Sequence, residues 1–111
     1  MISLGTGPFA SEQRSKPRIA VHASAEVTIG EQRTTTWVYD ISASGAHMTR
    51  VPGAQLSALC KFDLPGYGVV AASVVRVEPD SFAVTFPPDP QLNAFMDDPE
   101  VVLERLRAAA N

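Results

Sequence analysis

The amino-acid sequence predicts a mainly β fold, an antiparallel barrel or sandwich of about six short strands followed by a C-terminal α-helix. Apolar and polar residues alternate with a period of two in several segments between residues 19 and 86. Turn residues such as Gly, Pro and Asp separate these segments at short intervals. Helical spacing of apolar residues begins only after the proline-rich stretch at 87–90. The expected strands cover residues 19–29, 34–41, 46–50, 56–64, 67–77 and 81–86.

The first two strands have the clearest patterns. In residues 19–29 the odd positions are apolar and most even positions are polar, which indicates a half-buried strand. Residues 34–41 are rich in β-branched and aromatic side chains, which favour strands. On this second strand Trp37, Tyr39 and Ile41 have the same parity, so we expect their side chains on one face.

The later strands are shorter or more apolar. Residues 46–50 form a brief third strand that ends at a Val-Pro-Gly turn. Residues 56–64 alternate from Leu56 to Leu64, with Cys60 on the apolar side. Residues 67–77 are apolar at nearly every position, which predicts a buried, central strand. Residues 81–86 close the sheet with three apolar residues on one face.

The two ends of the chain differ in character. Residues 1–13 contain Gly, Pro and polar residues without a period, and we expect a flexible arm there. Residues 14–111 are expected to form one domain, with the sheet at about 19–86. Asp98 followed by Pro99 is a typical helix start, so a helix is predicted at about 99–110. A shorter helix is expected around residues 92–96.

The composition predicts an ordinary globular domain. A chain of 111 residues with 45% hydrophobic and 19% charged residues can bury a core without disulfides or metals. A net charge of −3 and a pI of about 5.2 argue against general DNA or RNA binding. Because Cys60 is the single cysteine, the simplest compartment is a reducing cytoplasm. The sequence predicts neither a signal peptide nor membrane insertion.

Two motifs carry the chemistry. Arg14-Ser-Lys-Pro-Arg18 is an RxxxR motif, and Pro17 favours a loop over a helix there. Asp40-Ile-Ser-Ala-Ser-Gly45 is a DxSxxG motif at the end of the second strand. Guanidinium groups match phosphate oxygens and the O6/N7 edge of guanine, and a carboxylate accepts from the guanine N1–H and N2–H groups. The combination suits a ligand that contains both phosphates and guanines.

The two motifs in this order resemble those of the PilZ domain family, which are bacterial receptors for cyclic di-GMP. The resemblance covers roughly residues 13–86 and implies a six-stranded antiparallel β-barrel with a C-terminal α-helix. It also implies the ligand-binding residues. Arg14 and Arg18 would contact guanine edges and phosphates, and Asp40 would accept from one guanine. Ser42 would bond to phosphate, and Gly45 would leave room for the ligand.

Each of these residues also has a structural explanation that needs no ligand. Arg14 and Arg18 could be a solvated basic patch, Asp40 and Ser42 could only stabilise a turn, and Gly45 could answer a backbone need. Secondary binding candidates are Gln13, whose neighbourhood affects ligand stoichiometry in the family, and Lys16. Trp37 is expected in the core or on the barrel surface, with base stacking as the weaker alternative.

The resemblance implies a cytoplasmic effector or adaptor without catalytic activity. Cyclic di-GMP would order the N-terminal arm, and a protein partner in motility, exopolysaccharide production or virulence would respond. The alternative is a PilZ-like protein-interaction module that binds no nucleotide. An enzyme would need an activated nucleophile or a metal, and His22 and His47 have no partners at metal-ligand spacing. We therefore expect no metal and no cofactor.

Overall fold

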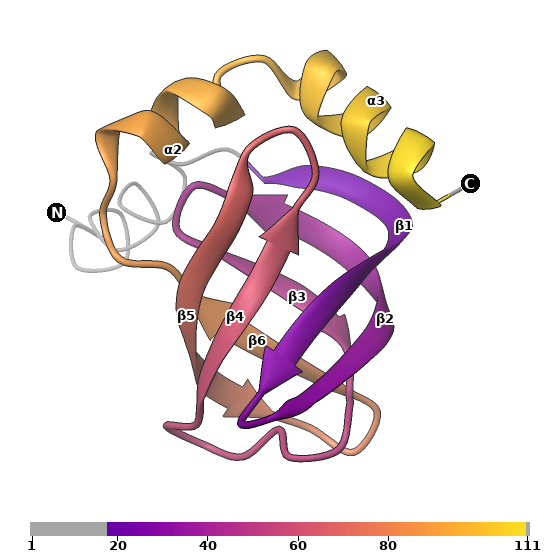
Figure 1. Ribbon diagram of the computed structural model, residues 1–111, viewed down its shortest axis with the longest axis vertical. Helices are drawn as coiled ribbons and strands as arrows, with labels where there is room; N and C mark the ends of the chain where they lie inside the picture. The colour runs from indigo at the N-terminus through magenta and orange to yellow at the C-terminus, as the bar shows by residue number, and fades with distance from the viewer. Residues whose placement is uncertain (1–17, 111) are drawn as a thin grey trace, which may run out of the picture.

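A computed structural model describes residues 18–110, and its six strands form a closed antiparallel barrel (Figure 1). Around the barrel the strands follow the order β1-β2-β3-β6-β5-β4, so that β1 and β4 pair to close it. This arrangement confirms the predicted barrel. The strands are β1 (Ile19–Ile29), β2 (Gln32–Ser42), β3 (Gly45–Thr49), β4 (Leu59–Leu64), β5 (Gly68–Val77) and β6 (Ser81–Thr85).

Short hairpins fix the register of the first three strands. β1 and β2 meet at the Ile29–Gln32 pair, and Gly30 in the turn has a φ of +64°, which glycine adopts without strain. β2 and β3 meet at the Ser42–Gly45 pair, so the DxSxxG motif forms the second hairpin. The motif therefore lies where two strands turn at one end of the barrel.

Side chains at every second position of each strand point inward and fill the interior of the barrel. On β1 all the odd residues from Ile19 to Val27 are buried, as the alternation predicts. Cys60 is also buried, and burial raises the pKa of its thiol, which makes it an unreactive core residue. The largest completely buried side chains of the barrel are Phe62, Phe82, Ile41, Met48 and Leu64.

Two helices, α2 (Pro90–Met96) and α3 (Pro99–Ala110), lie across one end of the barrel (Figure 1). The Asp89 carboxylate caps α2 by accepting from the Gln91 N–H at 2.9 Å. Leu92 of α2 and Val102 and Leu106 of α3 are almost completely buried. Their burial closes this end of the core, and α3 packs mainly against β1.

The β4–β5 hairpin is attached to the helices through Tyr67. Its hydroxyl donates to Asp89 at 3.0 Å, and its ring lies 5.4 Å from the ring of Phe95. Partial burial, and then the hydrogen bond and negative charge of Asp89, raise the pKa of Tyr67. The turn residue Gly66 also lies against the side chain of Arg105 on α3. These contacts fix the helices over the barrel end.

The fourth strand is shorter than the sequence predicts. It begins at Leu59, and Leu56 lies in a loop with its side chain 65% exposed. Ser57 has a φ of +70°, which interrupts extended backbone, and its N–H donates to the Val74 carbonyl. The alternation of apolar residues therefore starts at Leu56, before the backbone becomes a strand at Leu59.

The predicted strand over residues 67–77 is confirmed as β5, but it is buried on one face only. Val70, Ala72 and Val74 point into the core, whereas Val69, Ala71 and Val75 are exposed. A closed barrel has a single interior, so each strand buries one face unless another element covers the outside. Among the described residues, the helices pack on the barrel end and on β1 and leave the outside of β5 open.

Candidate functional site

The position of Asp40 depends on a β-bulge in β2. Val38 pairs with Met48, whereas Asp40 pairs with His47, so β2 contains one extra residue, Tyr39, relative to β3. Strict alternation from the buried Val38 would turn Asp40 inward, but the bulge turns it outward and returns Ile41 to the core. Asp40 is consequently available on the outer surface of the barrel.

The same bulge corrects the expected grouping of side chains on β2. Trp37 is 45% exposed, Tyr39 is half-buried, and Ile41 is completely buried. The three residues therefore do not share a face, although their numbers have the same parity. Residues of the same parity share a face only within a regular strand. The extra residue of a bulge turns every side chain beyond it to the opposite face.

Arg18 and Asp40 form an ion pair. Arg18 directly precedes β1, and β1 begins beside the end of β2 through the Ile19–Ile41 and Ala20–Asp40 pairs. One Arg18 nitrogen, Nη1, donates to Asp40 Oδ1 at 3.0 Å. The side chains are 59% and 26% exposed, respectively. Strand pairing thus brings together one residue from each of the two sequence motifs.

His47 is a third member of this cluster, and the sequence analysis did not assign it to the site. Its Nδ1 lies 3.8 Å from Asp40 Oδ2, and its ring lies 5.1 Å from the ring of Tyr39. Its Nε2 is buried without a hydrogen-bond partner among the described residues. The hairpin could have revealed this neighbour, because a two-residue turn after Ser42 places residue 47 opposite residue 40.

Ser42 lies inside the hairpin turn. Its side chain is 2% exposed, and its hydroxyl oxygen accepts from the Ser44 N–H at 3.1 Å. The hydroxyls of Ser42 and Ser44 are also 3.0 Å apart, within hydrogen-bond distance. These bonds are those of a turn-stabilising serine. The family resemblance assigns the Ser42 hydroxyl a bond to phosphate. In this conformation the hydroxyl bonds to Ser44 instead.

Gly45 is required by the approach of two strands. A side chain at this position would meet the backbone carbonyl oxygen of Val84 on β6, far inside van der Waals contact. The φ of Gly45 is not positive, so left-handed backbone does not explain the glycine. The Ser44 carbonyl also accepts from the Phe86 N–H at 2.9 Å. The glycine lets the motif hairpin pack directly onto the end of β6.

Three of the predicted binding residues, Gln13, Arg14 and Lys16, lie outside the described residues. Within residues 18–110, no group of three His, Cys, Asp or Glu side chains could hold a metal ion. No helix in the same range is long and apolar enough to cross a membrane.

The arrangement of Arg18, Asp40 and His47 can recognise a polar ligand on the barrel surface. Asp40 presents carboxylate oxygens that only accept hydrogen bonds, and Arg18 presents several donors beside them. Both side chains retain contact with solvent, so a ligand can approach without unfolding the barrel. A molecule with adjacent donor and acceptor edges matches this pair.

Residues 12–98 match the family model of the PilZ domain. The chain belongs to the PilZ family. Its six-stranded barrel and its C-terminal helices agree with this membership. A comparison with curated proteins gave no match.

Several solved structures share the fold of this PilZ chain. The inhibitor of motility MotI/DgrA of Bacillus subtilis is 19% identical, with a TM-score of 0.54 over 84% of this chain and 50% of that one. The PilZ domain of CeSA from a cellulose-synthesizing bacterium is 21% identical, with a TM-score of 0.56 over 83% and 95%. YcgR of Escherichia coli in complex with c-di-GMP is 15% identical, with a TM-score of 0.61 over 84% and 46%. The chain therefore spans about half of the MotI and YcgR chains.

We predict that Gly45→Ala destabilises the fold by about 2 kcal/mol or more, because the new methyl group forces β3 away from β6. Urea unfolding measures this change. Gly30→Asn is the control, because Gly30 has open space around it and Asn tolerates its positive φ, so the loss should stay below about 1 kcal/mol. A Gly45→Ala protein of normal stability that fails to bind ligand would instead assign Gly45 to the ligand.

Proposed function

We propose that this chain is a non-catalytic receptor for cyclic di-GMP. The observation that carries the proposal is the Arg18–Asp40 pair on the outside of the barrel, where strand pairing unites the two motifs. Support also comes from the similar structures, since two of them are YcgR or its PilZ domain with c-di-GMP. By the family resemblance, Arg14 supplies the second guanidinium.

Binding begins with an exchange of partners. An ion pair as exposed as Arg18–Asp40 contributes about 0–1 kcal/mol, so it opens at little cost. A bidentate contact to a guanine edge contributes about 1–3 kcal/mol. Asp40 then accepts from the N1–H and N2–H of one guanine, while Arg18 turns to a guanine O6/N7 edge or a phosphate. In the free protein the ion pair keeps the Arg18 and Asp40 side chains at the site.

The other motif residues have supporting roles. Ser42 holds the hairpin turn through Ser44, and a phosphate would have to compete with those bonds to reach its hydroxyl. His47 lies beside Asp40 and limits where its carboxylate can move. Lys16 and Gln13 would add charge attraction and amide hydrogen bonds next to Arg14. In this proposal Arg14, Arg18 and Asp40 recognise the nucleotide.

One observation favours the second candidate, a PilZ-like interaction module that binds no nucleotide. Arg18 and Asp40 satisfy each other, and the Ser42 hydroxyl is bonded within its turn, so these three groups are stable without a ligand. Such a module would act through a protein partner alone. We favour the receptor because the barrel surface keeps both charged side chains accessible.

The signal would be an ordering of the segment that precedes β1. Arg18 adjoins the barrel, and Arg14 lies four positions earlier, so phosphates held by both would fix the intervening residues. A partner protein in motility, exopolysaccharide output or virulence would bind the changed surface. Such a response needs only that the ligand bind the ordered state more tightly.

We predict saturable binding of cyclic di-GMP by calorimetry, and at least about fivefold weaker binding for Arg18→Ala and for Asp40→Ala, because each loses about 1–3 kcal/mol of guanine contacts. Arg33→Ala is the matched control. It removes another exposed ion pair between β1 and β2, Arg33–Glu26 at 3.6 Å, away from the motifs. No heat at tens of micromolar, or an equal loss with Arg33→Ala, would refute the receptor.

Base identity gives a second prediction. Cyclic di-AMP should bind at least about tenfold more weakly than cyclic di-GMP, because the adenine Watson–Crick edge presents an acceptor at N1 that Asp40 repels. Competition between the two ligands measures the ratio. In Asp40→Asn the ratio should shrink, since an amide can also donate. If the wild-type protein binds both ligands with equal affinity, the site recognises the phosphates and not the bases.

Hydrogen exchange tests the ordering of the arm. With cyclic di-GMP, amide protection should rise near residues 13–19 and at 40–45, and remain unchanged in α3, which lies over the barrel end. Fixing a residue costs about 1–2 kcal/mol, so only the few residues around the arginines should gain protection. Full protection of residues 13–18 before ligand is added would show that the site is preformed.

A further inference from the structure

The outer face of β4 and β5 gathers most of the large hydrophobic side chains that the described residues leave exposed. Leu59 on β4 is 77% exposed, and Val69 and Val75 on β5 are 64% and 54% exposed. Leu56 lies in the loop that hydrogen-bonds to β5 at Val74. Exposed apolar side chains gathered on one face of a protein are typical of an interaction surface.

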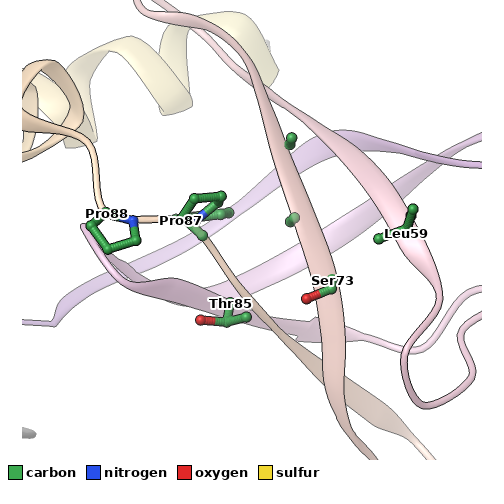
Figure 2. A pocket seen from close by; sticks show the side chains of 8 residues that line it. Leu59, Ser73, Thr85, Pro87 and Pro88 are labelled. Carbon is green, nitrogen blue, oxygen red and sulfur yellow. The ribbon is translucent and has the colours of Figure 1, made fainter.

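This face also contains a groove. A hollow of about 350 Å³ lies along β5 between Leu59 on one side and Pro87 and Pro88 on the other, with Ser73 on the strand between them (Figure 2). A second hollow of about 210 Å³ shares Ala71, Pro87 and Pro88 with the first. The two hollows together lie beside β5 from Val69 to Ser73.

Two unpaired charges of opposite sign lie among the apolar side chains. Lys61 and Asp63 alternate with buried residues on β4, so both project outward. Strand pairing places Lys61 beside Ala71 and Asp63 beside Val69. Neither residue makes an ion pair within residues 18–110, although the described surface holds three others that join Arg to Asp or Glu. The face thus combines apolar side chains with one unpaired cation and one unpaired anion in the middle of β4.

We propose that a second copy of this chain packs on this β4–β5 face. A two-fold axis that lies in the interface and crosses β4 at Phe62 brings Lys61 of each copy opposite Asp63 of the other. A surface that carries its own complementary charge two residues away is suited to such an isologous contact, the commonest type in soluble oligomers. Leu59, Val69 and Ala71 then leave solvent together, which supplies the favourable free energy.

The dimer is independent of the nucleotide site. In the order β1-β2-β3-β6-β5-β4, the strand across the barrel from β5 is β2, which carries Asp40. A copy seated on β4 and β5 therefore leaves the Arg18–Asp40 pair open on both chains. Failure of the dimer would not affect the receptor proposal, and failure of ligand binding would not affect the dimer.

Sedimentation velocity on the full chain without ligand, from about 1 to about 500 µM, tests the proposal. The wild-type protein should change from monomer to dimer, and Val69→Lys should raise the dissociation constant at least tenfold. Trp37→Lys is the control, because Trp37 is exposed on β2 across the barrel and should leave the constant unchanged. Circular dichroism verifies that each variant is folded.

The charges allow a sharper test. Lys61→Asp should weaken the dimer at least about fivefold, because it sets carboxylates against each other across the axis. The exchange of both residues, Lys61→Asp with Asp63→Lys, should restore the wild-type constant. A wild-type monomer at every concentration would overturn the proposal and leave this face to another partner. A dimer that survives Val69→Lys, or that Trp37→Lys disrupts equally, would also overturn it.

Discussion

The pairing of β1 with both β2 and β4 is the constraint on which the rest of the structure depends. It closes the sheet, and a closed sheet has a single interior. Every strand must then turn one face inward and the other outward. The helices cover the barrel end and part of β1, so most outer faces meet solvent or another molecule.

The candidate ligand site is a consequence of this closure combined with one irregularity. Regular alternation would bury Asp40, and the bulge at Tyr39 directs it outward instead. Arg18 reaches it because β1 begins where β2 ends. The resulting ion pair is weak because both side chains are exposed to solvent, and it holds the two charged groups beside each other.

The motif glycine and serine also have roles within the barrel itself. Gly45 permits β3 to approach the β6 backbone, and Ser42 holds the hairpin that the glycine completes. These contacts require the same residue types that ligand binding would require. In the proposed receptor the motif would both stabilise the hairpin and bind the nucleotide, so loss of binding in a motif variant must be separated from loss of folding.

The sequence by itself determined the six strands, the C-terminal helix and the two motifs, because alternation, turn residues and helix caps are local signals. It also indicated the barrel through the family resemblance. Only the tertiary structure decided which faces are covered. The apolar run in 67–77 is one-sided because the outside of β5 has no covering element, and Ile41 is buried because a bulge reverses the strand parity. The contact between Arg18 and Asp40 likewise depends on the irregular pairing of β1 with β2, whose register shifts between Ala20 and Ala23, and alternation and turn residues do not reveal such a shift.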